Sequence, residues 1–233
     1  MKTSNGYEYY YNTLEDGKQV RNNLIYTSLI NANKTIFCQW YYHDSDYHKG
    51  KNEAVDPALV QEKWEREVEF LELVYSQEPQ ICPKLLEIDK PNQKIMLEVQ
   101  GPDLWQQTID HNCNYADILP DWEDQMLNIL QIYKKLGIRK MSLHPSSYFI
   151  NNGKLQAINY FFTYYANEPK ICMQQLLSHI SLKRQEYMKN NTQHLGIDWN
   201  KYYDINTIQI LAIESFSDMY PQSFIDHAKQ IFI

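Results

Sequence analysis

Glycine and cysteine are scarce in this chain, and each scarcity excludes a class of protein. Only 7 of the 233 residues are glycine, so the chain has no glycine-rich loop of the kind that cradles phosphate with backbone amides. The cysteines are too widely spaced to form paired zinc ligands or the dense disulfide framework of a small secreted domain. The four of them are Cys38, Cys82, Cys113 and Cys172. We therefore expect reduced thiols.

Long apolar runs and basic stretches are absent as well. No segment approaches the ~20 apolar residues needed to cross a bilayer, and the first residues lack the apolar core of a secretion signal. The formal net charge is -7 at pH 7 with Lys and Arg scattered along the chain, whereas nucleic-acid binding favours a basic stripe. We expect a cytoplasmic protein that binds neither a membrane nor nucleic acid.

Tyrosine is abundant, by contrast, with 19 residues. Aromatic side chains favour strands and packed surfaces, and the chain contains no low-complexity segment. A chain of 233 residues is long enough to bury a substantial core, as one domain or as two small lobes.

The first hundred residues predict a strand-rich unit. Aromatic and β-branched residues alternate with turn signals, and one segment has apolar residues at helical spacing. The expected elements are three antiparallel strands within residues 7–42, a helix over 57–76 and two strands over 81–88 and 94–99.

The rest of the chain predicts mainly helices. A break at Gln100-Gly101-Pro102 separates it from the strand-rich unit. A strong helix over residues 122–136 ends at Gly137, a good stop residue. The segments near 169–190 and 205–233 also have helical patterns. We expect one domain over residues 1–100 and a second over 101–233.

Residues 141–161 carry the most informative motif and read MSLHPSSYFINNGKLQAINYF. Leu143-His144-Pro145 precedes an apolar strand, a turn at Gly153, a second strand and Asn159. This order resembles the catalytic centre of the protein kinase-like superfamily, especially its aminoglycoside and choline kinase branch, whose loop D-L-H-P-x-N precedes two strands and a metal-binding D-F/W-x motif. The resemblance covers roughly residues 20–165.

The resemblance implies a fold. It is an α+β, bilobal protein kinase-like fold with a five-stranded antiparallel amino-terminal lobe and a truncated helical carboxy-terminal lobe. The segment Met96-Leu97-Glu98-Val99-Gln100-Gly101-Pro102-Asp103-Leu104 resembles the hinge between the two lobes.

The resemblance also shows which catalytic groups the chain lacks. Ser142 stands at the position of the catalytic aspartate, Ser147 at that of the metal-binding asparagine, and Asn159 at that of the metal-binding aspartate. Phosphoryl transfer depends on these groups, and Mg²⁺ prefers carboxylate and phosphate oxygens. Serine cannot accept a proton at neutral pH, and losing a positioned acid-base group costs ~10² to 10⁴ in rate. No metal site is expected there.

The amino-terminal half lacks the family's phosphate-binding lysine. The family places a small residue and this lysine two positions apart on the third strand, hence on one face. One register pairs Phe37 with Gln39. The other pairs Cys38 with Trp40, and neither contains a lysine. If a nucleotide binds nevertheless, the resemblance assigns it to the hinge residues Glu98, Val99, Gln100 and Gly101.

Glu67 and His144 are the ionisable residues left at family positions. Glu67 stands where the helix glutamate pairs with the absent lysine, so we expect it on a solvated face or paired with Arg66 or Lys63. His144 is mainly a scaffold residue in the family, and we expect a structural role here, with catalysis as the alternative.

Other candidate features carry alternative interpretations. The cluster His43-Asp44-Ser45-Asp46-Tyr47-His48 contains metal-ligand residue types but matches no known spacing, which favours a solvated loop over a metal site. The aromatic segment 160–165, with Trp105 and Trp122, is either packed inside or part of a partner surface. Exposure decides between the two.

These observations lead to a functional prediction. We expect a catalytically inactive kinase-like protein, a pseudokinase, that binds a protein partner and uses no cofactor. The chain is also similar to uncharacterised small proteins of marine cyanobacterial tailed phages, which implies a viral regulator of a host factor. Two alternatives stay open: an atypical phosphoryl or nucleotidyl transferase that binds ATP, with or without Mg²⁺, and a structural or virion-associated protein.

Overall fold

The computed structural model of this chain has a mixed α+β architecture. It describes residues 57–99, 103–173 and 196–233, single positions at 186, 189 and 190, and, before residue 41, only the backbone of short strands. Within these ranges, no helix has the length and apolar character that crossing a membrane requires.

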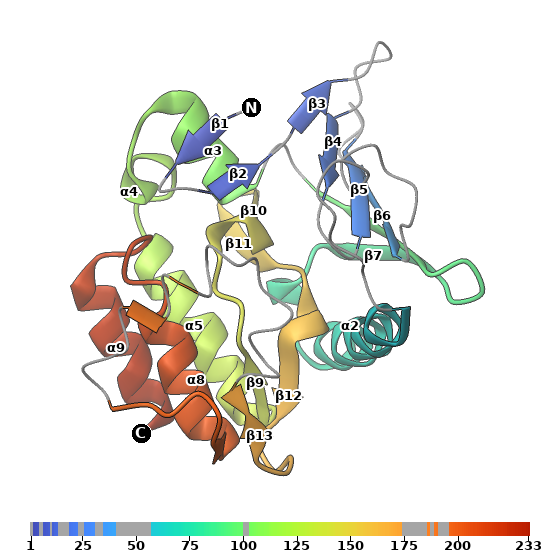
Figure 1. Cartoon of the computed structure of the whole chain (residues 1–233). Helices are drawn as coiled ribbons and strands as arrows, with labels where there is room; N and C mark the ends of the chain where they lie inside the picture. Colours follow the sequence, from blue (N-terminus) through green and yellow to red (C-terminus); the bar gives the residue numbers. More distant parts are fainter. Residues whose placement is uncertain are drawn as a thin grey trace.

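A six-stranded antiparallel sheet dominates the first part of the chain (Figure 1). Its order is β3-β4-β5-β6-β8-β7, and β1 and β2 form a separate hairpin. The bounds are Lys2–Ser4 for β1, Tyr7–Tyr9 for β2, Tyr11–Thr13 for β3, Gln19–Asn22 for β4, Tyr26–Ile30 for β5, Thr35–Trp40 for β6, Lys84–Asp89 for β7 and Lys94–Glu98 for β8.

The expected number of five strands is wrong. The region over residues 7–42 contributes four strands to the sheet, where the sequence predicted three. The difference arises between residues 18 and 30, which contain two strands, β4 and β5, although no glycine or proline marks a turn between them. The two expected strands after the helix are present as β7 and β8.

Helix α2 (Pro57–Gln77) lies beneath the sheet and beside β12 in Figure 1. The predicted helical spacing is confirmed, since one face of α2 is buried and the other is exposed. The buried face includes Trp64, Val68, Phe70, Leu71 and Val74. The exposed face carries Glu62, Glu65, Glu69 and Glu72.

Two short antiparallel strand pairs, of which one is a hairpin, lie between α2 and the helical part of the molecule in Figure 1. β9 (Ile138–Lys140) pairs with β12 (Thr163–Tyr165), and β10 (Tyr148–Asn151) pairs with β11 (Lys154–Ala157). The β10–β11 turn has φ of 50° at Asn152 and 73° at Gly153. Positive φ at both central residues is typical of Asn-Gly hairpin turns, so the predicted glycine turn is confirmed.

The carboxy-terminal half is mainly helical. The expected helix over 122–136 is α5, and Gly137 follows it with φ of 69°. The segment 205–233 forms two helices. The segment 169–190 contains the short strand β13, which pairs with β14, and residues 174–185 lie outside the described ranges. The bounds are Leu104–His111 for α3, Tyr115–Ile118 for α4, Trp122–Lys135 for α5, Ile171–Cys172 for β13, Tyr202–Tyr203 for β14, Ile205–Glu214 for α8 and Gln222–Phe232 for α9.

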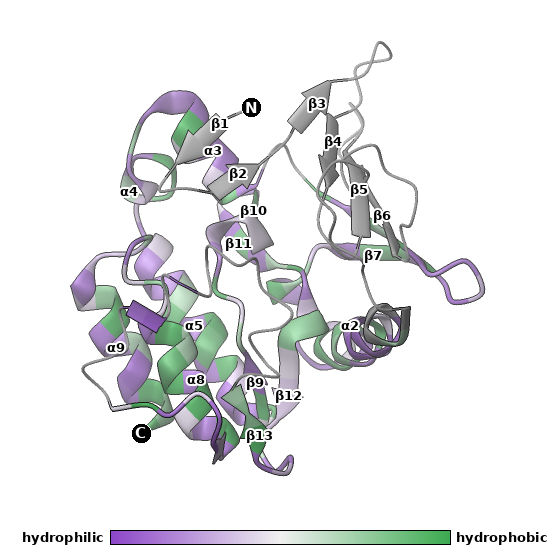
Figure 2. Cartoon of the chain, viewed as in Figure 1, coloured by the Kyte–Doolittle hydropathy of each residue, from purple (hydrophilic) through white to green (hydrophobic). Residues whose placement is uncertain are grey.

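Aromatic side chains hold α9 against the preceding helices. The ring of Phe224 lies 5.2 Å from that of Trp122 and 4.8 Å from that of Tyr220, centroid to centroid. Figure 2 shows hydrophobic residues gathered where α5, α8 and α9 meet. Tyr220 donates a hydrogen bond of 2.6 Å to the carbonyl of Leu143, so this core also supports the loop before β10.

Replacing Phe224 with alanine should destabilise the fold. Its ring is fully buried, and removing such a ring costs about 3–5 kcal/mol of unfolding free energy. Chemical denaturation measures the loss. The matched control is Ile233→Ala, at a side chain that is 78% exposed, which should change stability by less than about 0.5 kcal/mol. Equal effects of the two changes would contradict this account of the core.

Candidate functional site

Ser147 and Asn159 meet at one end of the β10–β11 hairpin. Ser147 ends the short 3₁₀ turn η2 (Pro145–Ser147) just before β10, and Asn159 follows β11. Because the strands pair antiparallel, with Tyr148 opposite Ala157, the start of one lies beside the end of the other. The Asn159 Nδ2 donates a hydrogen bond of 2.9 Å to the Ser147 Oγ.

This pair is neutral and enclosed. Ser147 is 2% and Asn159 5% exposed, and Asn159 has a φ of 64°, a left-handed conformation that asparagine tolerates well. Mg²⁺ is usually held by carboxylates, and none lies in this pair. Within the described ranges no group of three or more His, Cys, Asp or Glu side chains is placed to hold a metal ion. The residues present do not fit the magnesium ions that the resemblance implies.

The loop between β9 and η2 is held through its carbonyl groups. Lys140 Nζ donates a hydrogen bond of 2.8 Å to the carbonyl of Ser142, and Tyr220 bonds the next carbonyl, that of Leu143. Ser142 is half-buried. The position that the resemblance assigns to the catalytic aspartate is therefore rigidly supported but carries only a hydroxyl group.

His144 is built into this loop. Its Nδ1 accepts a hydrogen bond of 3.1 Å from the backbone amide of Ser146 and lies 2.7 Å from the Ser146 Oγ. The rings of Trp105 and Phe216 lie 5.5 Å and 6.4 Å from the imidazole, both edge to face. A neutral His144 must carry its proton on Nε2, because Nδ1 is an acceptor. These contacts fix the imidazole within the loop.

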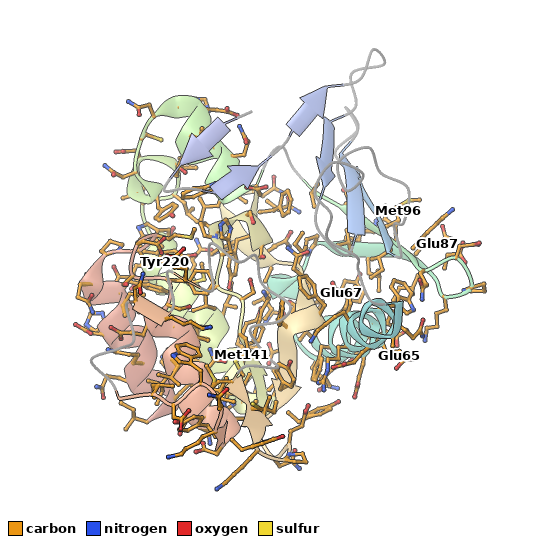
Figure 3. All side chains as sticks on the ribbon, viewed as in Figure 1. Glu65, Glu67, Glu87, Met96, Met141 and Tyr220 are labelled. Atoms are coloured by element: carbon orange, nitrogen blue, oxygen red, sulfur yellow. The ribbon has the colours of Figure 1, made fainter. Side chains whose placement is uncertain are left out.

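Glu67 is buried, and its expected position on a solvated face or in a pair with Arg66 or Lys63 is wrong. Its side chain is 4% exposed and accepts a hydrogen bond of 2.8 Å from the backbone amide of Phe161. Figure 3 shows it on the side of α2 opposite to Glu65. Position 67 shares the buried face of α2 because it lies three residues after Trp64 and four before Leu71, a spacing visible in the sequence.

Arg66 and Lys63 bind the segment that follows η3 (Tyr160–Phe162) instead. The Arg66 guanidinium forms two hydrogen bonds, of 3.1 and 3.3 Å, with the two carboxylate oxygens of Glu168. Lys63 Nζ donates a hydrogen bond of 3.3 Å to the Tyr164 Oη. Helix α2 thus holds residues 161–168 at several points.

Burial shifts the pKa values of two oppositely charged groups toward each other. Loss of hydration raises the pKa of the Glu67 carboxyl to about 7, against the opposing effects of the Lys140 charge and the Phe161 amide. Loss of hydration lowers the pKa of Lys140 to about 7, against the opposing charge of Glu67. Burial also raises the pKa of the Cys82 thiol to about 12, which keeps it protonated.

The aromatic segment is packed inside. Tyr160, Phe161, Phe162 and Tyr164 are all buried, and so are Trp105 and Trp122. Of the two interpretations that the sequence left open, the structure supports packing over a partner surface for these residues.

The remaining candidates are placed only in part. Gln39 pairs along the backbone with Lys94, but the side chains of β6 lie outside the described residues. At the hinge, Glu98 is exposed and Val99 is buried, whereas Gln100 and Gly101 lie outside the described residues. The segment 43–48 lies outside them as well.

Sequence reasoning missed Lys140 and the groups around it. Lys140 is 1% exposed, with its Nζ 5.6 Å from the ring centre of Tyr148 and 5.8 Å from that of Tyr160. The Tyr160 Oη lies 3.1 Å from the Cys82 Sγ. Lysine is rarely buried, and nothing in the local pattern distinguished this one from a surface lysine.

Removing the Ser147 hydroxyl should weaken the protein. In Ser147→Ala the Asn159 amide loses its serine acceptor inside the protein, which costs about 1–3 kcal/mol of unfolding free energy. Chemical denaturation of this variant is compared with that of Ser223→Ala, at an exposed serine of α9. If the two variants were equally stable, the pair would contribute nothing to the fold.

Stability should also depend on pH through Glu67 and Lys140. The folded protein keeps the Glu67 proton between pH 4.5 and about 7, where the unfolded chain has released it, so the unfolding free energy falls as pH rises through this window. The folded protein releases the Lys140 proton at about pH 7, whereas the unfolded chain keeps it up to 10.5, so the unfolding free energy rises above pH 7. The summed contribution is smallest near pH 7.

The experiment measures the free energy of unfolding of the unchanged protein and of the double variant Glu67→Gln/Lys140→Met from pH 5 to pH 9. The quantity compared is the first value minus the second. The difference should pass through a minimum near neutral pH, with slopes of at most about 1.4 kcal/mol per pH unit on either side. A difference that does not vary with pH would contradict the shifted pKa values of Glu67 and Lys140.

Comparisons with known proteins add little to this geometry. No family model matches the chain, and no curated protein matches it. Among solved structures, the bifunctional kinase-methyltransferase WbdD is similar with a TM-score of 0.43 and 10% sequence identity, over 88% of this chain and 47% of that one. The chain thus spans about half the length of that protein.

Proposed function

We propose that this chain is a pseudokinase, a kinase-like protein without catalytic activity that acts by binding a protein partner. The observation that carries the proposal is the hydrogen bond of 2.9 Å between Ser147 and Asn159. The two positions that would hold magnesium in a kinase-like centre are neutral, buried and bonded to each other.

The arrangement of the chain supports the kinase-like part of the proposal. An antiparallel sheet, α2 and two further strands precede the helical half, in the order that the resemblance implies. Three positions that the resemblance assigns to one centre also lie close together, because Glu67 bonds the backbone two residues after Asn159, which bonds Ser147. A bilobal kinase-like fold accounts for this convergence.

The chemistry of the same residues supports the absence of catalysis. Phosphoryl transfer requires charge neutralisation by metal ions and an acceptor for the proton of the nucleophile. Ser142, Ser147 and Asn159 supply neither a carboxylate nor a base. Glu67 is engaged with the backbone of η3 and is therefore not available to a strand lysine. A protein of this kind acts through a surface that binds a partner. For a viral protein, that partner is a host factor.

Nucleotides should leave the thermal stability of the protein unchanged. The experiment is a thermal shift assay with ATP, ADP and GTP at millimolar concentration, each with and without Mg²⁺. A ligand at 100 times its dissociation constant stabilises the folded state by about 2.7 kcal/mol, so binding at this level is easily detected. We expect no shift, and the protein should transfer no phosphate to any substrate.

Two other outcomes would replace the proposal. A magnesium-dependent shift, lost in Asn159→Ala, would favour the atypical ATP-binding transferase. Stable self-association measured by light scattering, without capture of another protein, would favour the structural or virion-associated alternative. Ser223→Ala, far from the Ser147–Asn159 pair in sequence, controls for general effects of substitution in both assays.

A further inference from the structure

The helices α5 and α9 leave a groove between them at the protein surface. They run in the same direction, since the rings of Trp122 and Phe224 meet where the helices begin and Lys134 donates a hydrogen bond to the carbonyl of Ile231 where they end. The volume of the groove is about 490 Å³, within the range of roughly 300–1,000 Å³ that ligand sites occupy. This α5–α9 groove is lined by Leu127, Gln131, Lys134, His227, Gln230 and Ile231.

The lining forms one stripe on each helix. The stripe on α5 consists of Leu127, Gln131 and Lys134, and the stripe on α9 of His227, Gln230 and Ile231. Residues three or four positions apart share one face of a helix, so the two stripes run side by side. Leu127 and Ile231 are half-buried and supply the apolar part, whereas the other four side chains are exposed and polar. Two such stripes can receive the face of a third helix, whose side chains at the same spacing pack between them.

The α5–α9 groove carries a positive charge, although the chain as a whole has a formal net charge of -7. The side chains that line it include Lys134 and no carboxylate. The adjacent Lys135 forms an ion pair with Glu78, whereas Lys134 pairs with no carboxylate in the part of the chain that the structure describes. The ammonium group of Lys134 bonds to the carbonyl of Ile231 and has two further N–H donors. A ligand with a carboxylate can use both.

Two amides and an imidazole complete the polar part of the lining. Among the described residues, Gln131 and Gln230 have no hydrogen-bond partner for their side chains, so both amides are available to a ligand. The Nδ1 of His227 lies 3.2 Å from the carboxylate of Glu123, which is outside the lining, and the Nε2 remains for a further partner. The groove therefore combines a small apolar part with several groups that bind a polar side chain.

We propose that the α5–α9 groove is the docking site for an amphipathic helix of the protein partner, which places an aliphatic side chain between Leu127 and Ile231 and a carboxylate against Lys134. This inference rests on the proposed function, because it names the kind of partner that the chain binds. A basic helix would bring a like charge to Lys134. A wholly apolar helix would cover the same charge without a counter-charge, which costs free energy. Both are therefore disfavoured against an acidic helix.

The experiment selects binders of the purified protein from a displayed library of helical peptides with randomised surface positions. The selected peptides should carry Asp or Glu three or four positions from Leu, Ile or Met, because these residues then share one face. One selected peptide is synthesised with a fluorescent label, and its dissociation constant is measured by anisotropy. Changing its acidic residue to Lys should weaken binding by about tenfold or more.

Variants of the protein place the peptide in the groove. Gln131→Trp fills the groove with an indole ring and should weaken binding by about tenfold or more. Lys134→Gln removes the charge and should weaken binding of the acidic peptide by about two- to fivefold. The matched control is Lys135→Gln, at the next residue of α5 but outside the lining, which should leave the dissociation constant unchanged. All three positions are exposed, and thermal unfolding checks that each variant folds.

The inference is overturned if no peptide is selected, or if the selected peptides bind Gln131→Trp as tightly as the unchanged protein. Self-association of the chain that Gln131→Trp abolishes would assign the groove to a second copy and overturn it as well. A partner protein that binds the unchanged protein and Gln131→Trp equally would overturn the groove assignment and leave the proposed function standing. Phosphate transfer by a protein whose groove binds the acidic peptide would do the reverse.

Discussion

The hydrogen bond from the Phe161 amide to the Glu67 carboxylate is the contact on which the centre of the molecule depends. It joins α2, which packs beneath the sheet, to the turn that follows the β10–β11 hairpin. A carboxyl group buried at 4% exposure needs hydrogen-bond partners inside the protein. The need to satisfy Glu67 therefore constrains the path of η3.

The same constraint explains why residues 161–168 are part of the fold. Once η3 is held by Glu67, the strand β12 runs beside β9 and along α2, where Arg66 and Lys63 bind it. Most aromatic side chains of this segment are buried, and Lys63 of α2 lies over the rings of Phe162 and Tyr164. Residues 161–168 thus form a packed connection between α2 and β9.

Local patterns predicted the elements but not the charges between them. Helical spacing located α2, the Asn152-Gly153 pair located the hairpin turn, and the order of the motif placed Ser147 and Asn159 together. The predicted number of strands before residue 41 was wrong because no glycine or proline separates β4 from β5 in the sequence. The burial of Glu67 follows from periodicity, yet its charge argued for the surface. The burial of Lys140 could not be found from the sequence, because the rings beside it, those of Tyr148 and Tyr160, come from other segments.

Ser147 and Asn159, as a neutral pair, have a physical advantage over two carboxylates when no metal is bound. Carboxylates placed side by side for metal binding repel each other until a cation arrives, so such a centre destabilises the metal-free fold. The hydrogen bond between Ser147 and Asn159 contributes to stability without any metal. Glu67 binds the following turn through the amide of Phe161. The two contacts together hold the end of the hairpin and η3 in one arrangement through groups of this chain alone.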